Sequence, residues 1–180
     1  KAIDEVITNA VKSNKPLNVI KPDPSKYAAE VPTLLTTTWG QQMPYNKLLP
    51  NTKKGRLITG CVATATAQVL NYFKYPVRGI GSHTVYYPAN DPSGVAVSAD
   101  FGNTTYDWAN MKDDYSGNYT EAEANAVATL MLHCGVASEM QYGGPNEGSG
   151  AYMTDCAAGL RTYFGFPDAE YITRADYTDE

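Results

Sequence analysis

The feature that most constrains the fold is a stretch without charged side chains, residues 57–73, which contains Gly60 followed by Cys61. Small and apolar residues continue from the cysteine, and Pro76 follows soon after. A proline disfavours helical geometry in the residue before it. We therefore predict a central helix over residues 61–73. The stretch holds too many Thr, Gln and Asn residues to span a bilayer.

This arrangement places Cys61 at the start of a helix. The helix N-terminus carries unpaired N–H groups and a partial positive charge, so it stabilises an anionic sulfur there. Gly60 allows a sharp turn and a close approach by a substrate. We predict that Cys61 is the nucleophile of an acyl-transfer reaction.

Composition narrows the class of protein. The chain has 180 residues, 43% of them hydrophobic, and a net charge of -5 without a basic cluster. It is long enough for one domain or most of one, and its charge argues against nucleic acid as a partner. We find neither zinc-ligand spacing nor a phosphate-binding loop, so we expect no metal and no cofactor.

The three cysteines give an odd count, which is typical of a free reactive thiol beside two others. Cys134 and Cys156 lie on apolar faces of predicted helices. We expect both to be buried thiols, and a disulfide between them is the alternative.

Other segments show weaker periodic signals. Residues 2–14 place apolar side chains on one helical face, and residues 15–26 resemble a linker or surface crossing. Residues 85–87 and 95–97 are the best candidates for extended chain.

Two further helices are expected. Residues 120–134 begin with a Thr120–Glu123 capping box, and Gly135 suits a left-handed residue just past the end. We expect Leu132 on the buried face of this helix.

The last helix is expected over residues 151–164. Ser149 is its predicted N-cap and Gly165 its stop, and Met153 is expected to face inward.

A cysteine nucleophile needs a base, usually histidine. His83 lies in a predicted turn region and His133 near the end of the helix over residues 120–134. The spacing directs neither towards Cys61, so we expect both to be structural. Trp39 and Trp108 are expected in the core or at an interface between lobes rather than in contact with substrate.

Several segments together resemble the streptopain family of bacterial papain-like cysteine peptidases, over about residues 31–175. The segments that carry the resemblance are Leu34 to Asn46, Thr59 to Val69, Tyr72 to Pro76, Tyr106 to Trp108, Leu130 to Met131, Gly135 to Val136 and Met140 to Gly143. The Thr-Gly-Cys-Val-Ala-Thr-Ala-Thr-Ala-Gln run is far more specific than an isolated Gly-Cys pair.

The resemblance implies an α+β, papain-like fold with two lobes. Residues 28–180 would be the N-terminal, mostly helical portion, ending before most of the β-sheet lobe. Residues 1–27 would be a propeptide tail or linker. The catalytic histidine would then come from a companion C-terminal chain. The family also implies a zymogen that is secreted or held at the cell surface or in the periplasm.

The resemblance assigns two groups to the oxyanion hole, the Gln41 side chain and the Cys61 backbone N–H, with Gln42 as the alternative glutamine. In the glycine-rich loop, residues 142–150, two interpretations stay open. Gly143, Ser149 and Gly150 could bind an extended peptide, or the loop could be only a connector.

The leading hypothesis is therefore a secreted cysteine endopeptidase that acts on protein or peptide substrates and is restrained by its own propeptide. A cysteine amidase or a transglutaminase-like enzyme is the first alternative. An inactive fragment that serves as a binding lobe is the second.

Overall fold

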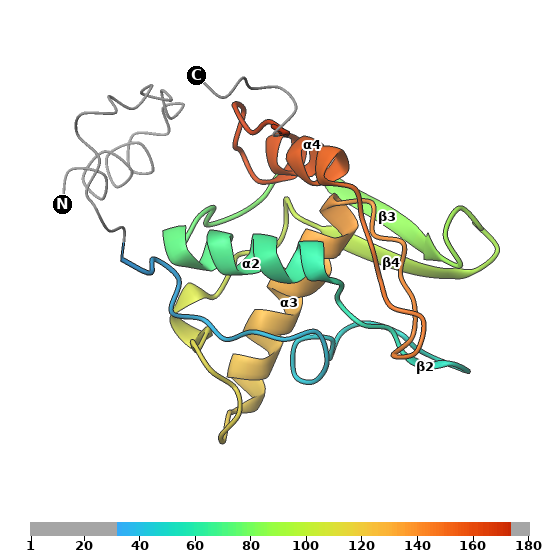
Figure 1. Ribbon diagram of the computed structural model, residues 1–180, viewed down its shortest axis with the longest axis horizontal. Helices are drawn as coiled ribbons and strands as arrows, with labels where there is room; N and C mark the ends of the chain where they lie inside the picture. Colours follow the sequence, from blue (N-terminus) through green and yellow to red (C-terminus); the bar gives the residue numbers. More distant parts are fainter. Residues whose placement is uncertain (1–31, 174–180) are drawn as a thin grey trace.

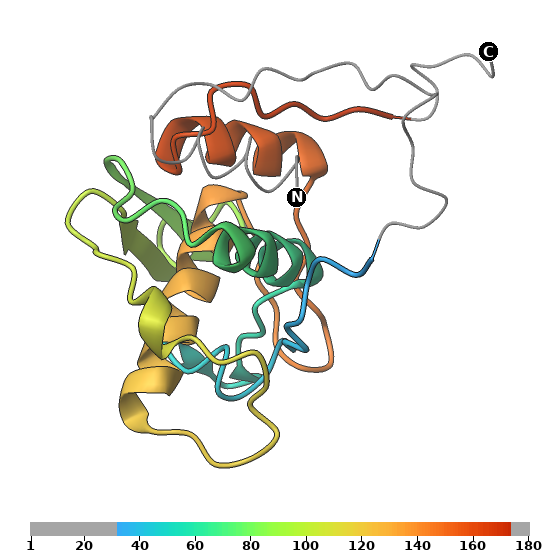
Figure 2. The same ribbon diagram turned by 90° about the vertical axis from the view of Figure 1, so that its left-hand side faces the viewer.

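The computed structural model describes residues 32–173, drawn in colour in Figures 1 and 2. The predicted helix over residues 2–14 and the linker over residues 15–26 lie outside this range. The described residues form an α+β fold, as expected. Its elements are, in chain order, β1 (Asn51–Thr52), β2 (Gly55–Arg56), α2 (Cys61–Phe73), β3 (Ser82–Tyr87), β4 (Val95–Asp100), the short 3₁₀ helix η2 (Trp108–Asn110), α3 (Glu121–Ala137) and α4 (Met153–Tyr163).

Helix α3 is the central element. It packs against α2, α4, η2 and both strands of the β3–β4 hairpin. In Figure 1, α2 lies across α3, and α4 lies beyond α2 on the side away from η2. This arrangement buries most of α3 and leaves one end of α2 near the surface.

The sequence predicted helix α2 with its observed bounds. Its buried face combines small residues with Leu70, which lets α3 approach closely. The helix ends where Lys74 adopts a left-handed conformation (φ 51°), two residues before Pro76.

The two predicted extended runs form the antiparallel hairpin of β3 and β4, in which Val85 pairs with Val97. Burial alternates along β4, so Val97 and Ala99 face the core while their neighbours face solvent. His83, which we expected in a turn region, lies within β3.

The capping box at the start of α3 is confirmed. The Thr120 hydroxyl accepts a hydrogen bond from the Glu123 N–H at 3.2 Å, and the Glu123 carboxylate accepts one from the Thr120 N–H at 2.6 Å. Leu132 is only partly buried, contrary to expectation.

The predicted end of α3 at Gly135 was wrong. The helix continues to Ala137, and the left-handed residue after it is Glu139 (φ 52°). Gly135 serves packing instead, because a Cβ atom at this position would lie 2.2 Å from the Tyr142 hydroxyl. The glycine thus makes room for a buried tyrosine.

Two predictions for α4 also need correction. Tyr152, not Ser149, is the N-cap, and it caps without a side-chain hydrogen bond. Met153 is 51% exposed rather than inward. Gly165 does follow the helix with a positive φ of 72°, as expected for its stop.

Met131 lies at the centre of the core, where its side chain is fully buried. We expect Met131→Ala to lower the free energy of unfolding by about 2–5 kcal/mol, because it removes apolar contacts and leaves a cavity. Urea denaturation of the folded protein measures this change. Exposed Met153 provides a matched control, since Met153→Ala should change stability by less than about 0.5 kcal/mol. Equal losses in the two variants would contradict the proposed core.

Candidate active site

Cys61 is the first residue of α2, as the sequence predicted, and the structure shows that it is exposed. No side chain caps this helix, and its first turn contains no acidic residue. The first N–H groups of a helix have no partner within the helix, so they can face an anion at this end. The start of α2 can therefore bind an oxyanion beside Cys61.

The turn before Cys61 requires a glycine. Gly60 has a positive φ of 85°, which is unfavourable for other residues. A Cβ atom there would lie 2.7 Å from Met140 Sδ and 3.2 Å from Ser149 Cβ. The tight packing of Met140 and Ser149 around this position fixes the direction in which the chain enters α2.

Two buried threonines complete the turn. Thr64 Oγ1 donates to the Gly60 carbonyl at 2.9 Å and lies 3.0 Å from Thr59 Oγ1. Both threonines belong to the cysteine motif, but the sequence alone indicated no role for them. The signal that could have indicated this contact is their spacing, because two threonines five residues apart lie on either side of the predicted helix start.

Gln41 lies directly beside this turn. The backbone carbonyl oxygen of Gln41 accepts a hydrogen bond from the Thr59 N–H at 3.2 Å, and the residue is half-buried. The neighbouring Gln42 is exposed. Buried Trp39 anchors the segment, since its indole N–H donates to the Lys112 carbonyl at 2.8 Å. The structure thus brings the segment of the predicted oxyanion glutamine next to the cysteine turn.

The glycine-rich loop contacts the same turn from another side. Gly143 is buried, and its carbonyl accepts from the Ile58 N–H at 3.1 Å. The Ser149 hydroxyl accepts from the Gly143 N–H at 3.0 Å and donates to the Ile58 carbonyl at 2.7 Å. Gly150 is exposed and pairs with Gln141 through two backbone hydrogen bonds. Gly143 and Gly150 therefore use their backbone groups to shape the loop.

Glu147 connects this loop to two other segments, a role that the sequence did not indicate. Its carboxylate pairs with Lys54, which follows β1, and accepts from the Tyr87 hydroxyl at 3.2 Å. These partners are distant in the chain, so no local pattern could reveal them.

The contacts of both histidines are with groups other than Cys61 in the part of the chain that is described. His83 Nε2 lies 2.6 Å from Glu139 Oε1, and its ring stacks on Tyr163 with centroids 5.7 Å apart. His133 is buried within α3, and its Nδ1 lies 2.9 Å from the Tyr106 hydroxyl. These contacts support structural roles.

His133 gives the fold a defined acid sensitivity. Burial lowers the pKa of His133 to about 4, although Asp100 partly opposes the shift. An unfolded histidine titrates near pH ~6.5, so below that pH the unfolded chain gains a proton that the folded chain does not. Stability is therefore complete above about pH 6.5 and falls by about 3 kcal/mol as the pH drops to about 4.

Urea denaturation at pH 7.5 and pH 4.5 checks this expectation. His133→Gln should lose most of the pH dependence in that window, even though the substitution itself lowers stability at pH 7.5. His83→Gln is the control and should keep the dependence. A His133→Gln variant with the original pH dependence would show that another group causes it.

Cys134 and Cys156 are buried free thiols, which confirms the expected burial and excludes the alternative disulfide in this structure. Burial, together with the nearby Cys156, raises the pKa of the Cys134 thiol. Cys61 is therefore the one exposed thiol of the three.

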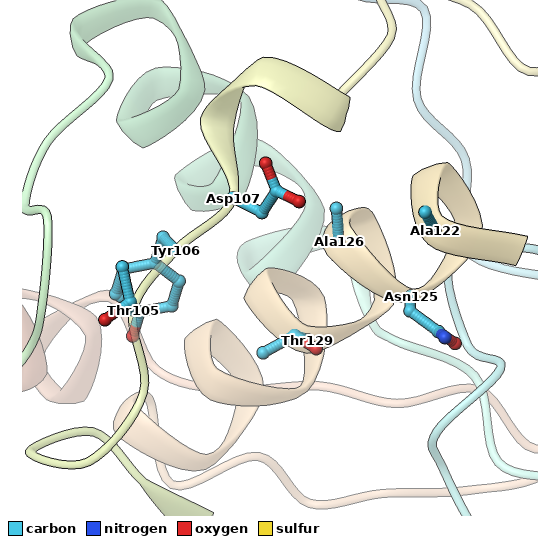
Figure 3. Close-up of a pocket in the computed structure, with 7 residues that line it drawn as sticks. All are labelled: Thr105, Tyr106, Asp107, Ala122, Asn125, Ala126 and Thr129. Atoms are coloured by element: carbon cyan, nitrogen blue, oxygen red, sulfur yellow. The ribbon is translucent and has the colours of Figure 1, made fainter.

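A separate pocket of about 250 Å³ lies between α3 and the chain just before η2. Figure 3 shows its lining, which comprises Thr105, Tyr106, Asp107, Ala122, Asn125, Ala126 and Thr129. It lies along the N-terminal half of α3, whereas the cysteine turn contacts Met140, beyond the C-terminal end of that helix. The pocket is thus distinct from the Cys61 region.

Residues 32–173 contain no cluster of three or more metal-ligating side chains. Over the same range, every helix is too short or too polar to cross a membrane.

An α+β fold in which helix α2 begins with an exposed cysteine and packs against α3 is that of a papain-like cysteine protease. The chain belongs to the Peptidase C10 family, whose model matches residues 39–180. The resemblance to streptopain that the motifs indicated is therefore confirmed.

Two solved structures are very similar to this chain. One is a fragment of Prevotella intermedia prointerpain A with a cysteine-to-alanine mutation. It is 96% identical to this chain with a TM-score of 0.85, and the match covers 99% of this chain and 57% of the fragment. The other is active wild-type interpain A cysteine protease of P. intermedia, which is 95% identical with a TM-score of 0.85, matching 89% of this chain and 65% of that one.

Two more distant relatives are also named as proteases of this kind. Streptopain of Streptococcus pyogenes is 29% identical over 98% of this chain and 48% of its own length. The thiol protease/hemagglutinin PrtT of Porphyromonas gingivalis is 31% identical over 76% of this chain and 16% of its own. The chain thus spans about half the length of streptopain.

Proposed function

We propose that this chain is the nucleophile-bearing part of a cysteine endopeptidase, with Cys61 as the nucleophile. The observation that carries the proposal is an exposed cysteine at an uncapped helix start, in a chain of the Peptidase C10 family. Relatives of this chain are named as cysteine or thiol proteases.

The proposed reaction is acyl transfer in two steps. The Cys61 thiolate attacks the carbonyl carbon of the peptide bond, and the resulting oxyanion accepts hydrogen bonds from the Cys61 N–H and the Gln41 side chain. The C–N bond then breaks, a histidinium gives its proton to the leaving amine, and a thioester remains on Cys61. Water attacks the thioester, gives a proton to the histidine, and releases the acid and the thiolate.

We assign the general base to a histidine outside this chain, on a companion C-terminal portion. His133 is buried against Tyr106, and His83 faces Glu139 and Tyr163, so neither is available to Cys61. The chain alone is then expected to lack proteolytic activity.

Substrate binding is assigned to the loop that contains Gly143, Ser149 and Gly150. Exposed Gly150 follows Ser149, which packs against Gly60 beside Cys61, while Gly143 and the Ser149 hydroxyl hold the loop against Ile58. An extended peptide would follow this edge, as in strand-like peptide recognition.

We also propose synthesis as a zymogen with an inhibitory propeptide, of which residues 1–27 would be the tail. The name of the related prointerpain A fragment describes such a pro-form for that protein. Export to the cell surface, periplasm or medium is part of the same proposal.

Substrate profiling of the complete peptidase tests the proposed function. We expect casein hydrolysis, with no release of peptidoglycan fragments and no ammonia release from glutamine side chains in the presence of amines. Peptidoglycan cleavage would instead support an amidase, and amine incorporation a transglutaminase-like enzyme. Casein hydrolysis by residues 1–180 alone would contradict the external base.

A further inference from the structure

A single peptide group connects two segments of the site that are more than a hundred residues apart in the chain. The Ile58 carbonyl accepts from the Ser149 hydroxyl at 2.7 Å, and the Thr59 N–H donates to the Gln41 carbonyl at 3.2 Å. The C=O and N–H of a trans peptide point in opposite directions. The Ile58–Thr59 peptide group therefore lies between the glycine-rich loop and the Gln41 segment.

The Ser149 hydroxyl is itself held in a fixed direction. It accepts from the Gly143 N–H at 3.0 Å, and the Gly143 carbonyl in turn accepts from the Ile58 N–H at 3.1 Å. The distance from the hydroxyl to the Ile58 carbonyl, 2.7 Å, is much shorter than the 3.3 Å to the Gly143 carbonyl. The single hydroxyl proton therefore points to Ile58.

This peptide group links the Gln41 backbone to the turn that leads into Cys61. Cys61 follows Thr59 after one residue, Gly60, which is packed against Met140 and Ser149. Thr64 fixes the Gly60 carbonyl from the side of the helix. A rotation of the peptide group would break the hydrogen bond to the Gln41 backbone carbonyl, and the hydrogen bond from Ser149 opposes such a rotation.

We propose that Ser149 is a positioning residue that acts through the Ile58–Thr59 peptide group to hold Gln41 in place beside Cys61. The inference rests on the oxyanion role proposed for Gln41. In this account the serine hydroxyl supports the transition state through Gln41 and need not touch the substrate.

A double-mutant cycle between Ser149→Ala and Gln41→Ala in the complete peptidase tests the proposal. We expect Ser149→Ala to lower kcat for a peptide substrate by about 5- to 10-fold, the worth of one lost hydrogen bond, with KM within about twofold. In the Gln41→Ala background, the same substitution should lower kcat by less than about twofold, because the group it positions is absent.

Two further measurements separate positioning from misfolding. The rate at which iodoacetamide alkylates Cys61 should be unchanged by Ser149→Ala, because alkylation forms no oxyanion. The variant should stay folded at the assay temperature, although the lost hydrogen bonds lower its thermal midpoint. Ser98→Ala is the control, since it removes a hydroxyl that lies 2.8 Å from Thr84 Oγ1 on the β3–β4 hairpin. It should leave kcat unchanged.

Equal losses of kcat from Ser149→Ala in both backgrounds would overturn the proposal while leaving the oxyanion role of Gln41 intact. A rise in KM alone would also overturn it and would favour direct substrate binding by Ser149. Full kcat in Gln41→Ala would overturn both the positioning role and the oxyanion assignment.

Discussion

Replacement of Cys61 by alanine is expected to abolish peptide hydrolysis by the complete peptidase, with a loss in kcat on the order of 10⁴-fold or more. The covalent route requires the sulfur, and alanine offers no nucleophile. The fold should remain, because Cys61 is exposed and alanine suits the first turn of a helix. Initial rates on a fluorogenic peptide, with circular dichroism for the fold, measure both effects.

The other two cysteines provide matched controls. Cys134 is buried in the core, and the sulfur of Cys156 lies 3.2 Å from Thr66 Oγ1. Cys134→Ala and Cys156→Ala should lower stability while keeping kcat per folded molecule. If Cys61→Ala kept substantial activity, or if either control abolished kcat in a folded protein, the nucleophile would be misassigned.

Replacement of Gln41 by alanine is expected to lower kcat by about 10²-fold with little change in KM. An oxyanion donor stabilises charge that develops only in the transition state, so its loss slows the chemical step rather than weakening binding. Steady-state kinetics on the same peptide provide the measurement. The circular dichroism spectrum should match that of the unmodified peptidase.

Gln42 serves as the control for this substitution. It adjoins Gln41 but is exposed, whereas Gln41 is half-buried beside the turn. Gln42→Ala should therefore change kcat by less than about twofold. A larger loss in Gln42→Ala than in Gln41→Ala would move the oxyanion role to Gln42.

Local signals in the sequence predicted much of the fold. Helix α2 appeared with its observed bounds because a glycine precedes it, a proline follows it and its residues carry no charge. The capping box at Thr120 was equally local. Gly135 and Ser149 were misassigned because their actual roles depend on Tyr142 and Ile58, which contact them only after folding.

The candidate site likewise contains residues that the sequence indicated and contacts that it did not. Cys61 and its glycine turn are contiguous, so the sequence indicated them directly, and the family resemblance added Gln41. The contacts of Ser149 with Ile58 and of Glu147 with Lys54 and Tyr87 join segments far apart in the chain. No periodicity or spacing encodes such pairs, so they could not be predicted from the sequence.

Competitive labelling of the three thiols tests the central claim most directly. The complete peptidase is treated with an epoxide or iodoacetamide probe under native conditions, and mass spectrometry follows each cysteine-containing peptide over time. We predict that Cys61 is modified first and that hydrolytic activity falls in step with its modification. Modification of Cys61 no faster than that of Cys134 or Cys156, or full activity after Cys61 is modified, would contradict its assignment as the nucleophile.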